Sequence, residues 1–224
     1  MKSPFTRPLM RRATLGLVAT ACLLITGCAT GGRLGTTSAP TPVQEQRQAA
    51  AEFSRLVESG APAKQVAVLE GGNPTIAVLK TRRAGAETYV TPDGVTLRMR
   101  DGLLTGTAGL GNDIQNSDLA QVSALLRSRN GGVAERFQTF LTGEYRAVTR
   151  TYLCTISPQG PAEIDLATRD GQLRKVKTRL MQEDCRSLDQ TFRNFYWLRG
   201  DRIVQSRQWA GAVSGMLVLR DLVN

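Results

Sequence analysis

Two different spacings of apolar residues divide this chain of 224 residues. After Thr41 the apolar residues follow a helical spacing, in a stripe made of Ala49, Phe53, Leu56 and Val57. Thr41 is placed to cap the helix, Pro42 lies in its first turn, Gln44 completes a capping box and Gly60 ends it. The pattern predicts an amphipathic helix whose apolar stripe packs on the rest of the domain.

Beyond residue 72 the spacing becomes two, which is typical of strands with one buried face. The segment Val95–Met99 shows it, because its apolar residues alternate with Thr96 and Arg98. Turn signals of two residues lie between such segments, at Asp93-Gly94, Asp101-Gly102, Asp170-Gly171 and Gly200-Asp201. Further strands are predicted around residues 144–156, 162–169, 172–181, 190–198, 202–209 and 214–222, while residues 133–142 fit no single pattern.

A second helix is predicted from Asp118 to about Ser128, with Ser117 as its cap and Asn130-Gly131-Gly132 at its end. Its inward residues are expected to be Leu119, Val122, Leu125 and Leu126. The repeated hairpins favour a mainly β fold: an antiparallel β-sandwich or open barrel of hairpins with two short packed α-helices. We expect residues 43–224 to form this single β-rich domain.

The N-terminal segment has the pattern of a bacterial export signal. A basic start precedes the uncharged stretch Ala13–Gly27, which is shorter than the roughly 20 residues of a membrane span. The stretch ends in Leu24-Ile25-Thr26-Gly27-Cys28, which matches a lipobox. We therefore predict a lipoprotein signal peptide over residues 1–27 and lipidation, with palmitate, at Cys28. Residues 28–42 are rich in Gly, Ser, Thr and Pro, which predicts a flexible tether.

Other processing sites fit this segment less well. Ala19-Thr20-Ala21 resembles an ordinary cleavage site, which would release a soluble protein beginning at Cys22. Cys22 is a poorer lipidation site because Ala19 stands where a lipobox has a larger aliphatic residue. Ala29 follows Cys28 in place of the aspartate that resembles an inner-membrane retention signal. We expect a protein anchored in the cell outer membrane, with its domain in the periplasm.

The charge balance narrows the class of partner. Four of the 29 basic residues and none of the 19 acidic residues lie in the signal segment, so the mature chain keeps a net charge of +6. An exported protein does not routinely meet nucleic acid, which we exclude as a partner. Lys175, Lys177 and Arg179 alternate along one predicted strand, a face that we interpret as solvated. Attraction to acidic polysaccharide or anionic lipid is the alternative to an ordinary solvated surface.

The residue types argue against catalysis. The chain has no histidine, which excludes histidine-based triads and histidine-ligated zinc. A glycosidase needs two carboxylates facing each other across a cleft, and neither Asp113 with Asp118 nor Glu163 with Asp165 lies in such a motif. We expect no enzyme, no catalytic residue, no metal site and no cofactor.

A glycine-rich segment, TGTAGLGNDI, contains Gly106, Gly109 and Gly111. It superficially resembles a phosphate-binding loop, but no Gly-Lys-Ser/Thr follows and no parallel-strand pattern surrounds it. We interpret it as a structural loop that needs unusual backbone angles.

The cysteines agree with export. Once Cys28 is lipidated, Cys154 and Cys185 remain as an even pair in an oxidising compartment, and we predict a disulfide between them. Two buried thiols are the alternative. No Cys-x-x-Cys spacing indicates a metal site.

The hairpin around Gly200-Asp201 carries a candidate contact site for a glycan or a protein partner. With this turn, Tyr196 is expected opposite Gln205, and Asn194 opposite Arg207. These four polar residues would form a cluster between apolar neighbours, namely Phe192, Leu198, Ile203 and Trp209. The alternative is an internal hydrogen-bond network, because buried polar groups on a sheet usually satisfy each other.

Two blocks of sequence resemble the YjbF/GfcB (YmcC-like) family of lipoproteins, which are encoded with genes for exopolysaccharide and group-four capsule secretion. The first is DGVTLRMRDGLLTGTAGLGNDI, Asp93–Ile114, a hairpin followed by a glycine-rich turn. The second is FRNFYWLRGDRIVQSRQWAGAVSGMLVL, Phe192–Leu219. The family's signature positions fall here on Asn194, Tyr196, Trp197, Ser206, Gln208 and Trp209.

This resemblance implies a function as well as a fold. It implies a non-enzymatic outer-membrane lipoprotein that serves as an accessory in exopolysaccharide or capsule export or assembly. Its partners would be the polysaccharide or proteins of the export machinery. A structural envelope lipoprotein that binds a protein partner and has no role with glycans is the alternative. A periplasmic carbohydrate-processing enzyme is a third hypothesis.

Overall fold

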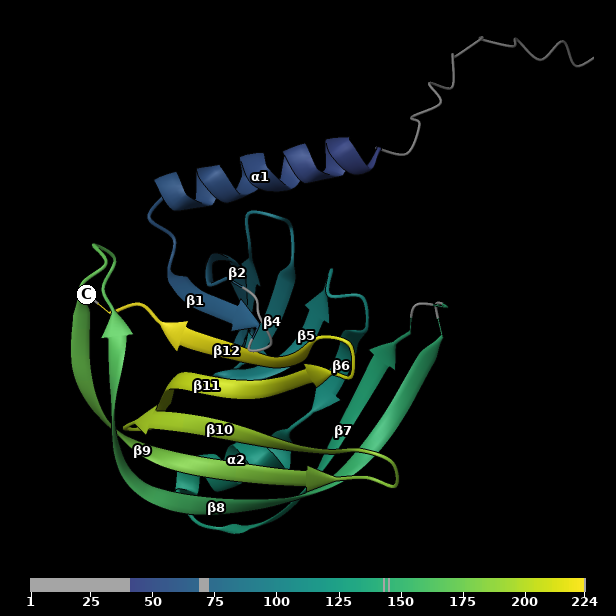
Figure 1. Ribbon diagram of the computed structural model, residues 1–224, viewed down its shortest axis with the longest axis vertical. Helices are drawn as coiled ribbons and strands as arrows, with labels where there is room; N and C mark the ends of the chain where they lie inside the picture. The colour runs from purple at the N-terminus through teal and green to yellow at the C-terminus, as the bar shows by residue number, and fades with distance from the viewer. Residues whose placement is uncertain (1–40, 69–72, 143, 145, 224) are drawn as a thin grey trace, which may run out of the picture. The chain divides into compact units, whose positions relative to one another are not determined.

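The computed structural model describes residues 41–68, 73–142, 144 and 146–223, which belong to one compact unit, Pro40–Asn224. Its strands are β1 (Ala63–Val68), β2 (Thr75–Arg83), β3 (Ala86–Val90), β4 (Thr96–Arg100), β5 (Leu103–Ala108), β6 (Asp113–Asp118), β7 (Gly132–Leu141), β8 (Ala147–Ala167), β9 (Leu173–Arg186), β10 (Thr191–Arg199), β11 (Arg202–Gly211) and β12 (Gly215–Asp221). They form one sheet in the order β5-β4-β3-β2-β1-β12-β11-β10-β9-β8-β7-β6. The sheet curls into a nearly closed antiparallel barrel (Figure 1), which confirms the predicted mainly β fold and selects the barrel over the sandwich.

Strands that follow each other in the chain are neighbours in the sheet, except β5 and β6, which form its two edges. In addition, β1 pairs with β12, the last strand of the chain. This pairing joins the run β1–β5 to the run β6–β12 in the middle of the sheet. Val66 lies opposite Leu219, and both are buried in the core. Lys64 lies opposite Asp221 with its ammonium on the carboxylate, so the junction also holds a buried ion pair.

Side chains bridge the edge strands β5 and β6. The Asp113 carboxylate accepts hydrogen bonds from Thr107 Oγ1 at 2.9 Å and from the backbone N–H groups of Gly109 and Leu110 at 2.9 and 3.0 Å. From the neighbouring strand β4, Arg98 Nη2 donates to the Gln115 carbonyl of β6 at 2.6 Å. The loop between the strands needs glycine at Gly109, whose φ is +95°. The glycine-rich segment is therefore a structural loop, as its sequence predicts.

Replacing Asp113 by Ala is expected to lower the free energy of unfolding by about 2 kcal/mol, because three hydrogen bonds to a half-buried carboxylate are lost. Urea denaturation of the variant measures this change. Asp165→Ala is the matched control: its side chain is exposed, so a change within about 0.5 kcal/mol is expected. Equal stability of the two variants would contradict a role for Asp113 in holding the edges together.

The first helix, α1 (Pro42–Glu58), begins as predicted, with both hydrogen bonds of the Thr41–Gln44 capping box present. The expected packing of its apolar stripe is only partly correct. Phe53 and Leu56 are half-buried, and Val57 is 49% exposed. The helix contacts the sheet mainly at β2, where Glu52 pairs with Lys80 at 2.9 Å. Because this contact area is small, part of the apolar stripe remains exposed to solvent.

The second helix, α2 (Ala120–Ser128), starts later than predicted, and Ser117 does not cap it. Ser117 belongs to β6, and the Asp118 carboxylate accepts the Ala120 N–H at 3.1 Å instead. Val122 and Leu126 are buried, as expected. Among the described residues, no helix has the length and apolar character needed to cross a membrane.

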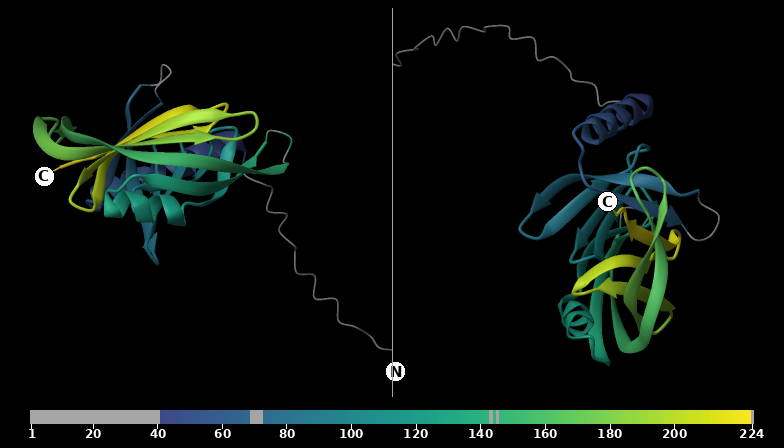
Figure 2. Two further views of the ribbon diagram at one scale, coloured as in Figure 1. Left: turned by 90° about the horizontal axis from the view of Figure 1, so that it is seen from below. Right: turned by 90° about the vertical axis from the view of Figure 1, so that its left-hand side faces the viewer.

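The longest strand, β8, replaces two predicted strands, 144–156 and 162–169. It continues through Pro158 and Pro161 because its pairing with β7 ends at Ile156, so both prolines lie where β9 is the remaining neighbour. The β8–β9 hairpin extends beyond the rest of the sheet and turns towards the C-terminus (Figure 2). There Thr168 forms an isolated bridge with Val223. The ambiguous residues 133–142 form most of β7.

Candidate functional site

The predicted hairpin forms, but its register differs from the expected one. Arg199 pairs with Arg202 across Gly200-Asp201, as predicted. Beyond Leu198 the register shifts, so Tyr196 lies opposite Ser206 and the expected pairing of Tyr196 with Gln205 is wrong. The extra residue is Val204, whose side chain packs in a small apolar cluster with Leu166 and Val176. The bulge therefore moves every later residue of β11 to the opposite face.

This shift separates the four residues of the candidate contact site. Asn194 and Tyr196 are fully buried and belong to the interior, with Ser206 and Gln208. Gln205 and Arg207 lie opposite Trp197 and Phe195 on the other face. Gln205 accepts a hydrogen bond from Arg220 at 2.9 Å. The predicted cluster of four residues is therefore not formed.

The interior pair belongs to a buried network centred on Glu183. Its carboxylate accepts hydrogen bonds from Tyr196 Oη at 2.6 Å, from Asn194 Nδ2 at 2.6 Å and from Arg136 Nη1 at 3.0 Å. All four residues are 0% exposed. The Arg136 guanidinium also lies over the Phe192 ring, 5.5 Å from its centre. For Asn194 and Tyr196, internal hydrogen bonding thus replaces contact with an external partner.

The network fixes the charge states of Arg136 and Tyr196. Burial alone would lower the pKa of the Arg136 guanidinium, but the charges and hydrogen bonds of Glu183 and Tyr196 together outweigh it and the pKa is raised. Burial, and then the nearby Glu183 charge, raise the pKa of the Tyr196 phenol well above its ordinary value. Arg136 therefore stays charged, and Tyr196 stays protonated and donates to Glu183. Arg136 Nε and Nη2 have no hydrogen-bond partner among the described residues.

Gln208 forms a second interior link. Its Oε1 accepts the Leu104 N–H at 2.9 Å, and its Nε2 donates to the Gly102 carbonyl at 2.9 Å. These bonds join β11 to the start of β5 across the inside of the barrel. Trp209 stacks on Phe192 with 5.6 Å between ring centres. Asn194, Tyr196, Gln208 and Trp209 are signature positions of the second sequence block, and their contacts hold the fold together.

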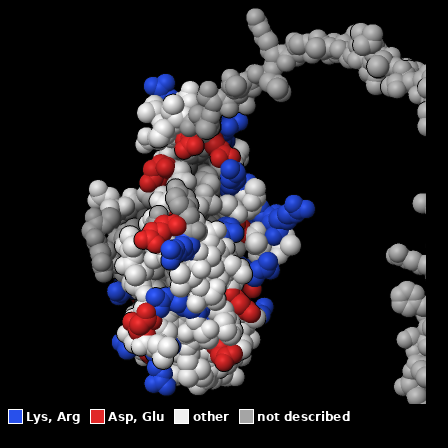
Figure 3. Space-filling view, turned by 90° about the vertical axis from the view of Figure 1, so that its right-hand side faces the viewer, with Lys and Arg blue, Asp and Glu red and all other residues white. Residues whose placement is uncertain are grey.

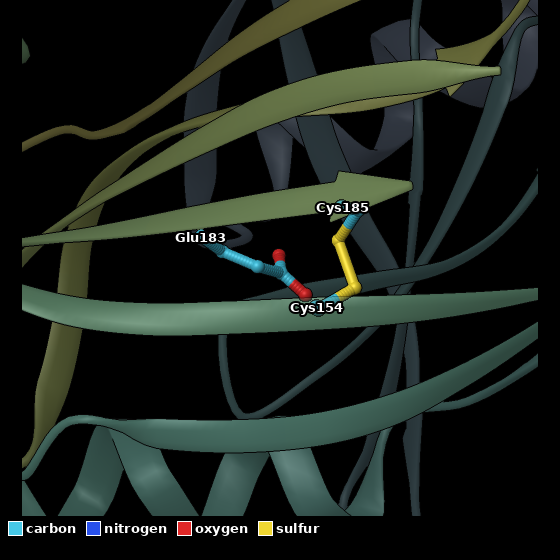
Figure 4. A group of neighbouring side chains, drawn as sticks. All are labelled: Cys154, Glu183 and Cys185. Atoms are coloured by element: carbon cyan, nitrogen blue, oxygen red, sulfur yellow. A yellow bond between two sulfur atoms is a disulfide. The ribbon is translucent and has the colours of Figure 1, made fainter. Parts of the chain in front are cut away.

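A group of three possible metal ligands lies beside the network. Atoms of Cys154, Glu183 and Cys185 lie within 4.8 Å of one another (Figure 4). The two cysteines, however, form a disulfide between directly opposed residues of β8 and β9, with an S–S distance of 2.02 Å. Metal binding requires thiolates, and Glu183 is already engaged by Arg136. The disulfide and the ion pair explain this cluster.

Three of the four carboxylates considered for catalysis have other contacts. Asp113 holds the β5–β6 edge, and the Asp118 carboxylate accepts the Ala120 N–H at the start of α2. Glu163, which is exposed on β8, lies 3.4 Å from the Lys175 ammonium. These contacts give Asp113, Asp118 and Glu163 structural roles.

Arg136 and Glu183 were not recognised from the sequence. Each occupies an inward position of a strand: Arg136 lies between Ala134 and Gln138 in the buried phase of β7, and Glu183 precedes Cys185 in that of β9. The sequence signal was a charged residue at a position where the alternation of the strand places buried residues, and it occurs on two separate strands. Cys28, the predicted lipidation site, and the predicted signal peptide lie outside the described residues.

Comparison with known proteins agrees with this structure. One similar solved structure is the crystal structure of the hypothetical lipoprotein YmcC from Escherichia coli K12, whose sequence is 20% identical to this chain. The two structures align with a TM-score of 0.64, over 84% of this chain and 98% of that one. This similarity shows a shared fold. No curated protein matches the chain. The family model described as group 4 capsule polysaccharide lipoprotein gfcB, YjbF, matches residues 37–222. The chain therefore belongs to the YjbF family of group 4 capsule polysaccharide lipoproteins.

Proposed function

We propose that this protein is an outer-membrane lipoprotein, anchored through Cys28, that assists the export or assembly of exopolysaccharide or capsule without catalysing a reaction. The observation that carries the proposal is the family match, which spans nearly the whole mature chain and names capsule polysaccharide. The lipobox ending at Cys28 supports the lipid anchor. The absence of an aspartate after Cys28 supports sorting to the outer membrane.

The described residues support a binding or scaffolding role. The polar residues of the barrel interior are engaged with one another: Glu183 with Arg136, Asn194 and Tyr196, and Gln208 with the backbone of β5. Groups committed to such a network hold the fold rather than turn over a substrate. The protein would therefore act through its outer surface.

One surface feature favours the alternative, a structural lipoprotein with a protein partner. Val133 and Phe137 on β7 are 62% and 37% exposed, and Leu153 on β8 is 43% exposed. Leu153 lies opposite Glu135, the outward residue between the other two. Grouped apolar side chains in solvent are typical of a contact with another protein.

Deletion of the gene is expected to reduce the polysaccharide found outside the cell, and the wild-type gene should restore it. A Cys28→Ala variant should not restore it, because the protein would lack its anchor. The measurement is the amount of polymer in the extracellular and intracellular fractions of each strain. Palmitate labelling of the wild-type protein and of the Cys28→Ala variant checks the anchor itself.

Each outcome separates the hypotheses. Polymer retained inside the deletion strain would place the defect after synthesis and support the export role. Unchanged amount and location of the polymer would contradict it and favour the structural alternative. Palmitate labelling that persists in the Cys28→Ala variant would contradict anchoring at Cys28.

A further inference from the structure

Four arginines surround a pocket at the end of the barrel where the β10–β11 turn, the β8–β9 turn and the C-terminal segment meet. The pocket has a volume of about 510 Å³, and its basic lining residues are Arg82, Arg169, Arg199 and Arg202. The right panel of Figure 2 looks onto this end, beside the C-terminus. The lining also includes the apolar side chains of Pro62, Val204, Leu222 and Val223. The pocket thus combines an apolar wall with several guanidinium groups.

The positive charge of this pocket exceeds what its acidic neighbours balance. Asp221 is the acidic residue of the described lining, and it is buried and already engaged by Lys64 and by Arg202, at 2.7 Å. Arg82 pairs with Glu87 at 2.7 Å. Among the described residues, Arg169 has one long hydrogen bond, 3.5 Å to the Ala61 carbonyl.

The Arg199 side chain has no hydrogen bond or ion pair within the part of the chain that the structure describes. At least two arginines of the pocket are therefore available to an external anion. On the face shown in Figure 3, by contrast, acidic and basic side chains are intermixed.

A second, smaller cavity continues the basic lining. It has a volume of about 330 Å³ and shares Arg199 and Val223 with the first. Its other basic lining residues, Arg174, Lys175 and Lys177, lie on β9. On the neighbouring strand β8, Asp165 lies opposite Lys175 and Glu163 lies opposite Lys177, 3.4 Å from the Lys175 ammonium. A ligand that extends from one cavity to the other meets cations along its length, which favours a polymer over a single small anion.

We propose that this pocket, with the adjoining cavity, binds a polysaccharide whose sugars carry carboxylates. The planar guanidinium group pairs with a carboxylate through two parallel hydrogen bonds, which is why arginine is favoured where carboxylates are recognised. A concave site also accepts a chain more readily than it accepts a flat membrane surface. The inference rests on the proposed function and deepens it by naming the polymer as acidic.

Binding of oligogalacturonate to the full mature protein in detergent tests this inference. The wild-type protein should bind it with an affinity that falls as salt is added. The same oligomer with its carboxylates methyl-esterified is the matched ligand and should bind at least about tenfold more weakly, which corresponds to about 1.4 kcal/mol. Calorimetry or fluorescence anisotropy measures both affinities.

A double variant, Arg169→Gln with Arg199→Gln, should weaken oligogalacturonate binding by at least about tenfold, or about 1.4 kcal/mol. The matched control is Arg47→Gln with Arg146→Gln, which removes the same charge from exposed positions outside the pocket and should leave the affinity unchanged. Both double variants should keep the wild-type unfolding midpoint, because the substituted side chains are exposed.

Several results would overturn the proposal. Equal binding of the esterified oligomer would exclude carboxylate recognition, and equal loss in both double variants would reduce the effect to net charge. Binding to vesicles of anionic phospholipid that the pocket variant loses, with oligogalacturonate binding retained, would assign the pocket to a lipid headgroup. A pocket variant that fully restores export in the deletion strain would contradict this inference alone, whereas a deletion without effect on the polymer would contradict the proposed function alone.

Discussion

Replacing Arg136 by Met is expected to lower the free energy of unfolding by about 3–5 kcal/mol, because it leaves the Glu183 charge buried without its cation. Both side chains are 0% exposed, so solvent cannot replace the lost partner. The hydrogen bonds from Asn194 and Tyr196 remain, but they do not supply a positive charge. Urea denaturation of the wild-type and variant proteins measures the difference.

Two further variants test the cause of this loss. Arg193→Met breaks an exposed pair with Asp184, on the strands that also carry Asn194 and Glu183, and should change the stability by less than about 1 kcal/mol. Adding Glu183→Gln to Arg136→Met removes the buried charge and should recover part of the loss. If the second substitution instead adds its full cost to the first, the two residues are not coupled.

Removal of the disulfide by Cys154→Ala with Cys185→Ala is expected to cost about 3–4 kcal/mol of stability. The two cysteines are 31 positions apart, and the bond removes the conformational freedom of the loop between them in the unfolded chain. Both residues face the core beside Glu183, so the bond also holds together the strands that carry the buried network. Urea denaturation with and without a reductant measures the effect.

The reductant supplies the control for this second experiment. Reduced wild-type protein should approach the stability of the double variant, and the double variant should not respond to the reductant. A variant as stable as the oxidised wild-type protein would show that the sheet alone restrains this loop.

The features that the sequence predicted correctly are those set by neighbouring residues. The capping box at Thr41 and Gln44 forms within one helical turn, so its residues are sufficient to identify it. The turn at Asp101-Gly102 needs two residues with positive φ, and the structure shows +53° and +81°. The start of α2 was less predictable, because Ser117 and Asp118 both pair with β7 as part of β6, which moves the N-cap position to Leu119.

The features that were missed depend on contacts between distant segments. The bulge at Val204 follows from its packing on Leu166 and Val176, which belong to another hairpin. Nothing in the sequence from Phe192 to Trp209 specifies this contact, so the simple register appeared sufficient. Arg136 and Glu183 are 47 positions apart, and each alone resembles an ordinary surface residue. Their partnership becomes visible only when β7, β8 and β9 are placed side by side.

The position of β12 in the middle of the sheet has a consequence for biogenesis. Lys64 and Asp221 are paired although 157 positions separate them, so β1 finds its neighbour only after almost the whole polypeptide is present. Until then β1 offers an unpaired edge, which has to be kept from other chains. Truncation of the last ten residues would not trim a border of the sheet. It would remove the strand between β1 and β11 and leave the runs β1–β5 and β6–β11 without the backbone pairing that joins them.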